Sequence, residues 1–583
     1  MNGPYSVSDL LTTAVAFAAL SFMVISIRIG LPAPDRMDTV LPGQTLSNQD
    51  LAALSEARST YFNELHELRA QRARAVLSGV DRDNDPRPTL KLPKPQRVFS
   101  VSDKLIAIRA FLLQPPNGDE GAPYAALANI RPRELKFDPH FYNYGGAFLY
   151  PIGGFLYFLG QLNILYLDSD ISFYADHPSE ITNMYLFGRS VNIFYFSLLM
   201  LAIWVTTRTL ATPRAAALAV SAIALSPLTW QMSLSTRPHV LAALLFLAGV
   251  LSLIKYRNAP KRGWLFAAAV AIGLASGAAL PAAIGWVIFP IMLWRCMPVP
   301  RWIYVSFATG VGVVLLYIVT NPFAVLSFPE FAANFLFHAT SDRYDRAMLS
   351  VSKLARFGTH LLYAYCFPVS LLGLIGFVYF SIRLRTEDLR RVSIAGLLLL
   401  VGAGATIAEP RIVFFIGPLV CISGAVVLDK WVTSTRAFAG AAIIALVPGL
   451  ASATIFMTDT LRESERFSGF DSWLSQVHAE RQHTSIGLLS RPIPHYFPPF
   501  PILRQELIYI GDGTETPSRL PAYVLVSSPD ESIWRKHPIR HSYRLVARDK
   551  MELLPRYMRI GGIRSWRETR RPHSIDVYSR TNL

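Results

Sequence analysis

The strongest constraint on the fold is a series of apolar runs, each about long enough to cross a bilayer as a helix. With 52% hydrophobic and only 16% charged residues, the chain is too apolar for a soluble enzyme of 583 residues. The sequence therefore predicts a polytopic α-helical membrane protein with about eleven transmembrane helices. The predicted spans are residues 9–29, 184–206, 214–231, 239–255, 264–279, 280–296, 302–320, 358–382, 392–408, 411–429 and 437–457.

Basic residues in the loops between these spans predict the orientation. They occupy alternate loops, and short loops rich in Lys and Arg stay in the cytoplasm. The N-terminus is therefore expected inside, whereas residues 30–183, 321–357 and 458–583 are expected outside. The first run has no basic segment before it and no cleavage site after it, so it is expected to be a retained anchor. The basic loops contain Arg208 and Arg214, Lys255 to Arg262, Arg295 and Arg301, Arg383 to Arg391, and Lys430 and Arg436.

The apolar stretch 147–167 has two interpretations. Counted as a span, it would invert every later loop and place the basic clusters outside, so a juxtamembrane helix on the outer face is favoured. Its length of about 20 residues also suffices for an ordinary transmembrane helix, and that alternative stays open.

The predicted membrane module covers residues 1–457 and includes the polar outer loop 30–183. Within this loop, residues 47–78 have the pattern of an amphipathic helix, and residues 80–98 have the pattern of a linker rich in proline and charge. The tail, 458–583, alternates turns with strand-like runs at 506–511 and 522–528, so it is expected to form a small α/β domain.

Charge and cysteine content exclude two classes of function. The excess of 56 Lys and Arg over 40 Asp and Glu lies largely in short loops and the tail, and no nucleic-acid-reading motif is present. Membrane topology and lipid headgroups explain this excess. The 3 cysteines lie in or beside apolar runs, so the outer regions contain neither a disulfide framework nor a cysteine zinc site.

Several segments, in this order, resemble a known family. Together with the first helix and the long outer loop, they look like the GT-C membrane glycosyltransferases, in particular the family 39-like branch of dolichyl-phosphate-mannose protein mannosyltransferases and lipid A aminoarabinose transferases. The resemblance covers roughly residues 105–430. Its segments are DE at 119–120, FDPHFYNYGG at 137–146, YLFGRS at 185–190, LSPLTW at 225–230, TNPFAV at 320–325 and EPRIVFFIGPL at 409–419.

The resemblance implies a polyprenyl-phosphate sugar donor, transfer on the outer face, and an acidic residue of the first loop as base. By position that residue is Asp119, with Glu120 beside it. A carboxylate can take the proton of an acceptor hydroxyl, and one base suffices for an inverting displacement. The family commonly carries this pair soon after the first helix, so Asp35 or Asp38 is the alternative base, whereas with Asp119 residues 39–104 become an insertion. A solvated turn is the simpler interpretation of the pair.

The donor leaves a lipid phosphate behind, and arginine offers a planar fork of donors for such a group. Arg411, Arg189 and Arg237 are the predicted phosphate-binding residues, although an arginine at a helix end also simply reaches the interface. The family often has an acidic residue where this chain has Arg237 and His239, which leaves metal involvement open.

Aromatic and basic side chains of the first loop are predicted to contact the acceptor or lipid headgroups: Arg131, Lys136, His140 and Tyr142. Anchoring at the membrane surface explains them equally well. Loop 321–357 either closes over the donor or only connects two helices. No metal site is assigned from the sequence, although Asp119 and Glu120 leave a weak divalent-cation site open.

The sequence thus predicts an inverting glycosyltransferase of the bacterial inner membrane, with a polyprenyl-phosphate sugar donor, a glycan, lipid or protein acceptor in the cell envelope, and a periplasmic C-terminal domain. The alternatives are a polyprenyl-lipid transporter or flippase and a non-catalytic envelope assembly protein. A transporter is expected to carry charged or broken spans near mid-membrane, whereas here ionisable residues gather at one end of the spans.

Overall fold

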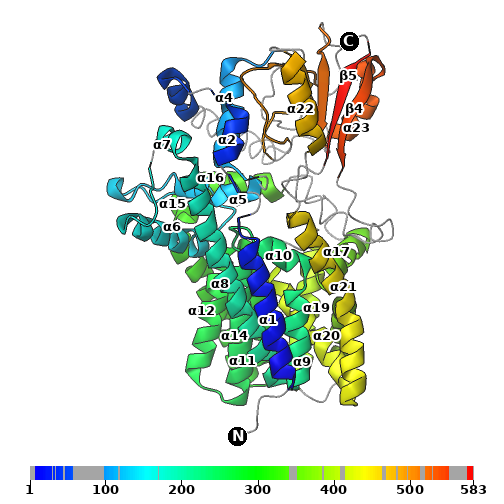
Figure 1. Cartoon of the computed structure of the whole chain (residues 1–583). Coiled ribbons are helices and arrows are strands. Elements are labelled where there is room, and N and C mark those ends of the chain that lie inside the picture. Colours follow the sequence, from blue (N-terminus) through cyan, green and yellow to red (C-terminus); the bar gives the residue numbers. More distant parts are fainter. Residues whose placement is uncertain are drawn as a thin grey trace.

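The computed structural model consists of a helical bundle, a middle layer of short helices and a mixed sheet at the far end (Figure 1). It describes residues 7–28, 31–32, 34–43, 46–56, 98–115, 118–168, 170–339, 351–383, 387–406, 414–461, 468–480, 484–494, 497–511, 519–527, 530–550 and 574–581.

The bundle contains a helix at each of the predicted spans. Among the described residues, five stretches are both long and apolar enough to cross a membrane: 178–210, 239–258, 299–320, 414–431 and 435–454. The other bundle helices do not combine this length with this apolarity, so the count of eleven spans stays a prediction. The bundle elements are α1 Val7–Ile25, α8 Pro178–Leu210, α9 Pro213–Ala224, α11 His239–Asn258, α12 Arg262–Ala278, η3 Leu280–Val287, α13 Ile288–Leu293, α14 Val299–Thr320, α18 Phe367–Arg383, α19 Glu387–Thr406, η4 Phe414–Ile416, α20 Gly417–Trp431 and α21 Thr435–Leu461.

Small residues bring two of these helices close together. A Cβ added at Gly373 of α18 would collide with the Val420 carbonyl of α20. Glycine therefore permits direct backbone packing, as is common between membrane helices. In contrast, α14 exposes Phe307, Leu315 and Val319, which fits a surface that faces lipid.

The bundle end away from the sheet carries several of the predicted basic loops, and ion pairs tie them to neighbouring helices. Arg214 Nε lies 2.6 Å from Asp429 Oδ1, and Thr212 caps α9 through its side chain while also donating to Asp429 over 2.8 Å. Arg257 pairs with Asp388 at 2.7 Å. These charges are therefore partly neutralised within the protein.

The middle layer separates the bundle from the sheet. Helix α6 lies in this layer beside α15, outside the bundle, as expected of a juxtamembrane helix (Figure 1). It buries Phe148 and Ile152 and exposes Phe155 and Phe158. An aromatic face of this kind suits the boundary between lipid and water. The elements of this layer are α5 Gly118–Leu127, η2 Pro132–Glu134, α6 Gly146–Gln161, α7 Ile171–Asp176, α15 Phe323–Leu326 and α16 Phe328–Ala339. Helices α10 Pro227–Ser233 and α17 Val351–Ala364 belong to the upper end of the bundle and contribute Trp230 and Phe357 to its core.

The tail forms a five-stranded sheet in the order β2-β1-β3-β5-β4. Strands β1 to β3 are parallel, whereas β5 runs antiparallel to β3 and β4. The strand-like runs predicted at 506–511 and 522–528 are confirmed as β2 and β3. The elements are α22 Ser468–Glu480, β1 Ser485–Leu488, β2 Glu506–Tyr509, β3 Tyr523–Ser527, α23 Glu531–Lys536, η7 Pro538–Ser542, β4 Tyr543–Lys550 and β5 Ser574–Arg580.

The first outer loop and the tail share one apolar core. Helices α2, Pro34–Val40, and α4, Val101–Leu113, contribute Met37, Ile108 and Phe111 to a cluster that also contains Trp473 and Leu507. The N–H of Phe99 donates to the Leu507 carbonyl over 2.8 Å, and a Ser100–Asp103 capping box begins α4. The predicted insertion 39–104 thus reaches the tail domain. Residues 48–56 are helical as predicted for 47–78, whereas the remainder of that stretch and most of the linker lie outside the described residues.

Candidate active site

Asp119 and Glu120 lie in the first turn of helix α5, and the two carboxylates have different environments. Glu120 is 1% exposed, and its two carboxylate oxygens accept from Nε and Nη2 of Arg189 over 2.7 and 2.8 Å. Nη1 of Arg189 donates to the Ile27 carbonyl over 2.7 Å. This bidentate buried pair ties α5 to α8 and to the segment after α1, and it is costly to break. Both carboxylate oxygens of Glu120 are therefore engaged within the protein.

Asp119 points to the protein surface. Its side chain is 48% exposed, and Oδ2 lies 3.2 Å from Nη2 of Arg237, which is itself 2% exposed. The Tyr144 hydroxyl donates to the Asp119 backbone carbonyl over 3.4 Å. A carboxylate oriented by a buried guanidinium yet open to solvent can accept a proton from an approaching hydroxyl.

The loop 234–238 supplies Arg237, and a buried amide holds this loop. Nδ2 of Asn192, on α8, donates to the carbonyls of Ser235 and Arg237, the latter over 3.0 Å. The N–H of Thr236 lies 3.3 Å from Oε1 of Glu120. One loop thus contacts both carboxylates of α5.

Gly188 permits the close approach of this loop to α8. A Cβ at position 188 would collide with the Tyr124 hydroxyl and with Thr236 Oγ1. Instead, the Tyr124 hydroxyl lies 3.0 Å from Thr236 Oγ1 and donates to the Met184 carbonyl over 2.9 Å. Burial raises the pKa of Tyr124 well above its usual range, so this hydroxyl stays protonated.

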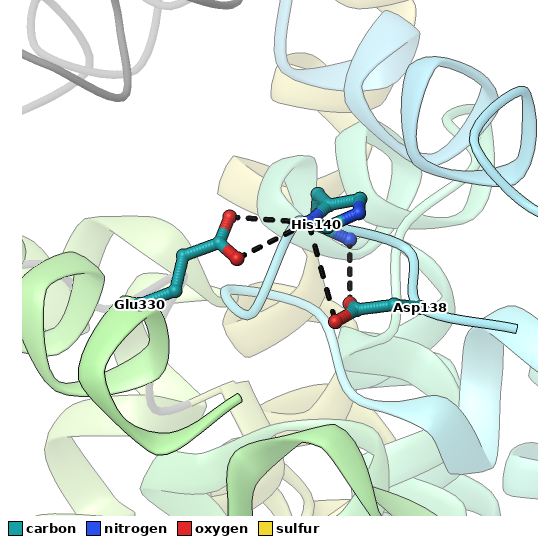
Figure 2. Close-up of side chains that lie close together, drawn as sticks. All are labelled: Asp138, His140 and Glu330. Atoms are coloured by element: carbon teal, nitrogen blue, oxygen red, sulfur yellow. Dashed lines mark hydrogen bonds and ion pairs between the residues drawn. The ribbon is translucent and has the colours of Figure 1, made fainter. Parts of the chain in front are cut away.

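A second polar cluster joins segments that are far apart in the sequence (Figure 2). Asp138, His140 and Glu330 each offer a ligand atom, and these atoms lie within 4.8 Å of one another. His140 Nδ1 is 3.1 Å from Glu330 Oε2. His140 has φ of 49°, an uncommon conformation for a residue other than glycine, and its backbone N–H donates to Asp138 over 2.9 Å. This turn directs the imidazole toward α16.

Hydroxyl groups orient the carboxylates of this triad. Ser327 donates to Asp138 over 2.6 Å, and the Tyr142 hydroxyl lies 3.1 Å from Asp138 and 3.2 Å from Glu330. Burial, together with Glu330 and Asp138, raises the pKa of Tyr142 well above its usual range, so its hydroxyl remains a donor.

Two carboxylates and an imidazole, with supporting hydrogen bonds, form a donor set suited to a divalent cation such as Mn²⁺ or Zn²⁺. The sequence analysis overlooked this set, because 190 residues separate Glu330 from His140 and no local spacing joins them. Asp119 and Glu120, where a weak cation site was left open, instead face Arg237 and Arg189.

The other residues predicted from the sequence do not gather at one place in the structure. Arg189 was predicted to bind the donor phosphate, but its guanidinium is buried against Glu120 and the Ile27 carbonyl. Arg237 contacts Asp119 as described. Arg411 lies outside the described residues. The alternative acids Asp35 and Asp38 lie exposed on α2.

The remaining predicted contacts lie along the first loop. Arg131 and Lys136 are exposed around η2, where both pair with Glu134, at 3.3 and 2.8 Å. His140 and Tyr142 belong to the triad and its support. Tyr142 and Tyr144 also line a small depression together with Tyr150 and Asn321. His239 packs edge-on against Tyr144, with ring centroids 6.3 Å apart.

No protein-family model and no curated protein matches this sequence. Solved structures that resemble the chain include the Archaeoglobus fulgidus oligosaccharyltransferase in its apo form, at 15% identity and a TM-score of 0.38 over 59% of this chain and 52% of that one. The archaeal oligosaccharyltransferase AglB of the same organism, in complex with an inhibitory peptide and a dolichol-phosphate, matches at 11% identity and a TM-score of 0.38 over 76% and 71%.

ArnT from Cupriavidus metallidurans, bound to undecaprenyl phosphate, matches at 14% identity and a TM-score of 0.32 over 67% of this chain and 84% of that one. The match spans about half of the apo oligosaccharyltransferase, 52% of its length, and all three likenesses are distant. The chemistry of this chain therefore has to be judged from its own residues.

Proposed function

We propose that this chain is a membrane glycosyltransferase that transfers a sugar from a polyprenyl-phosphate donor to a cell-envelope acceptor, with Asp119 as the base. One observation carries the proposal: two adjacent carboxylates have opposite environments, Glu120 locked by Arg189 and Asp119 half-exposed beside Arg237. Only one of them is available to a substrate, as a single displacement with inversion requires.

In the proposed reaction the acceptor hydroxyl attacks the anomeric carbon. The bond from the acceptor oxygen to that carbon forms as the bond from the carbon to the phosphate oxygen breaks. Asp119 takes the hydroxyl proton, and the lipid phosphate leaves as an anion. Arg237 keeps the Asp119 carboxylate oriented, and Arg189 keeps α5 in place through Glu120.

The triad would serve the leaving group. Asp138, His140 and Glu330 are the residues that would hold a divalent cation, which when bound would supply positive charge to a phosphate. Tyr144 connects the two parts, since its hydroxyl reaches the Asp119 carbonyl and it follows Tyr142 by two residues. Both groups lie at the end of the bundle that faces the sheet (Figure 1), which disfavours a transport pathway, because such a pathway would need charges deeper in the bundle.

The test is transfer of labelled sugar from a panel of polyprenyl-phosphate donors in membranes. Asp119→Asn is expected to lower the rate about 10²- to 10⁴-fold while donor binding is retained, because proton removal in the transition state is worth that much. Asp35→Asn and Asp38→Asn, at matched expression, test the alternative bases and are expected to retain transfer. Full activity of Asp119→Asn would refute the assignment of the base, and absence of transfer by the native chain with every donor would refute the proposed function.

A further inference from the structure

A polar cavity lies in the tail domain, away from the carboxylates of α5. It has a volume of about 410 Å³ and forms where α23, η7, the edge strand β4 and its neighbour β5 meet. In Figure 1 these strands and α23 lie at the right of the tail domain, on the side away from α4. The cavity is lined by Glu531, Arg535, Arg540, Arg548 and Tyr578.

The charges around this cavity do not balance. The Asp576 side chain is 5% exposed, and its two carboxylate oxygens accept hydrogen bonds from Nε and Nη2 of Arg548 over 2.9 and 2.8 Å. These bonds fix the orientation of the Arg548 guanidinium. Glu531 pairs with Arg535 at 2.6 Å. Among the described residues no carboxylate pairs with Arg540. Three guanidinium groups therefore face two carboxylates, and the cavity keeps an excess of positive charge.

Packing and strand pairing hold one side of the cavity in place. Tyr578 is 7% exposed and packs on Trp534, with ring centroids 5.2 Å apart. Burial raises the pKa of Tyr578, so its hydroxyl is protonated at neutral pH. Arg548 is held in register by the pairing of β4 with β5, opposite Asp576, and a fixed donor of this kind loses little freedom when a ligand binds. Arg535 and Arg540 are exposed.

Guanidinium groups bind carboxylates and phosphates through paired hydrogen bonds. A cavity of this volume, in the range of small-molecule sites, admits such an anion together with a body about the size of one or two sugar rings. We propose that this cavity is a binding site, separate from the transfer site, for a saccharide that carries a carboxylate or phosphate group. The saccharide part rests on the proposed function, whereas the anion part rests on the arginines alone.

The experiment uses the full chain in detergent micelles at low ionic strength and measures binding by calorimetry. The probes are an oligomer of a hexuronic acid, the matching neutral oligomer, a sugar phosphate and inorganic phosphate. The variants are Arg540→Gln and, as a matched control, Arg519→Gln. Arg519 is an exposed arginine of the same domain that pairs with Glu506 of β2, at the other edge of the sheet.

We expect an acidic saccharide to bind and the neutral oligomer not to bind. Arg540→Gln should weaken binding about tenfold or more, and Arg519→Gln should not change it. Thermal unfolding of each variant checks that the domain is intact. Equal binding of acidic and neutral oligomers, or equal effects of the two substitutions, would overturn the site. Inorganic phosphate binding as tightly as either acidic saccharide would overturn the saccharide part.

Sugar transfer, measured on the same samples, separates this inference from the proposed function. Loss of saccharide binding with transfer retained in Arg540→Gln supports a separate site. If the native chain binds no acidic saccharide but transfers sugar, the cavity proposal fails and the proposed function stands. If it binds but does not transfer with any donor, the proposed function fails and the anion site stands.

Discussion

Two groups of residues place carboxylates beside nitrogen groups, yet their side chains differ in burial. One is the α5 site, which consists of Asp119, Glu120, Arg189 and Arg237, and the other is the triad of Asp138, His140 and Glu330. In the α5 site, Arg189 and Glu120 are 6% and 1% exposed and hold one fixed geometry. In the triad, His140 and Glu330 are 48% and 30% exposed. Buried ion pairs fix a backbone, whereas exposed ligands can exchange a bound group. From this difference we expect a positioning role for the first region and ligand binding at the second.

The largest effect is expected from breaking the buried pair. Arg189→Leu leaves the Glu120 carboxylate buried without its main partner, and the free energy of unfolding should fall by about 3–5 kcal/mol. Denaturant unfolding in micelles measures this change. The double variant Glu120→Leu/Arg189→Leu should recover much of the loss, because no charge then stays buried. An Arg189→Leu chain as stable as the native one would show that the pair does not hold α5.

A smaller effect is expected from a substitution in the triad. It should change the affinity for a divalent cation and leave the free energy of unfolding nearly unchanged. Glu330→Gln should weaken Mn²⁺ binding by about tenfold to a hundredfold, since even residues that only support metal ligands contribute this much. Calorimetry with Mn²⁺ alone measures it. Glu134→Gln, an exposed carboxylate paired with Arg131 and Lys136, is the matched control. Equal affinities of the native and Glu330→Gln chains would exclude a cation site here.

The smallest effect is expected from the supporting hydroxyl. Tyr142→Phe removes a donor to Asp138 and Glu330 and should cost about 1 kcal/mol of Mn²⁺ binding, which is about fivefold in affinity. Because the pKa of Tyr142 is raised, its hydroxyl is protonated throughout neutral and mildly alkaline pH, and deprotonation would begin only above its ordinary value of about 10.

Without a bound cation, Tyr142 should therefore stay protonated from about pH 7 to 9. The ultraviolet difference spectrum between the native and Tyr142→Phe chains, recorded without added metal, checks this. A phenolate band that grows within that range would mean that Tyr142 loses its proton there, contrary to the environment of the hydroxyl.

The amino-acid sequence alone located every described helix of the bundle and two strands of the tail, because apolar length and alternation are local properties. It also singled out Asp119 and Glu120, Arg237, and the loop that contains His140 and Tyr142. It named Asp119 as the base by position, but it gave no separate environment to Glu120, since both acids stand at the start of one helix. Burial separates them, and burial depends on α8 and on the loop 234–238.

Only the tertiary structure brought Glu330 to Asp138 and His140, joined α4 to the tail in one core, and assembled the arginine cavity from four elements. Each of these depends on contacts between segments far apart in the chain, for which the sequence carries no periodic signal. Local physics therefore determined which segments are helices and which residues can do chemistry. Packing decided which of those residues meet, because the position of a side chain follows from the elements that surround it.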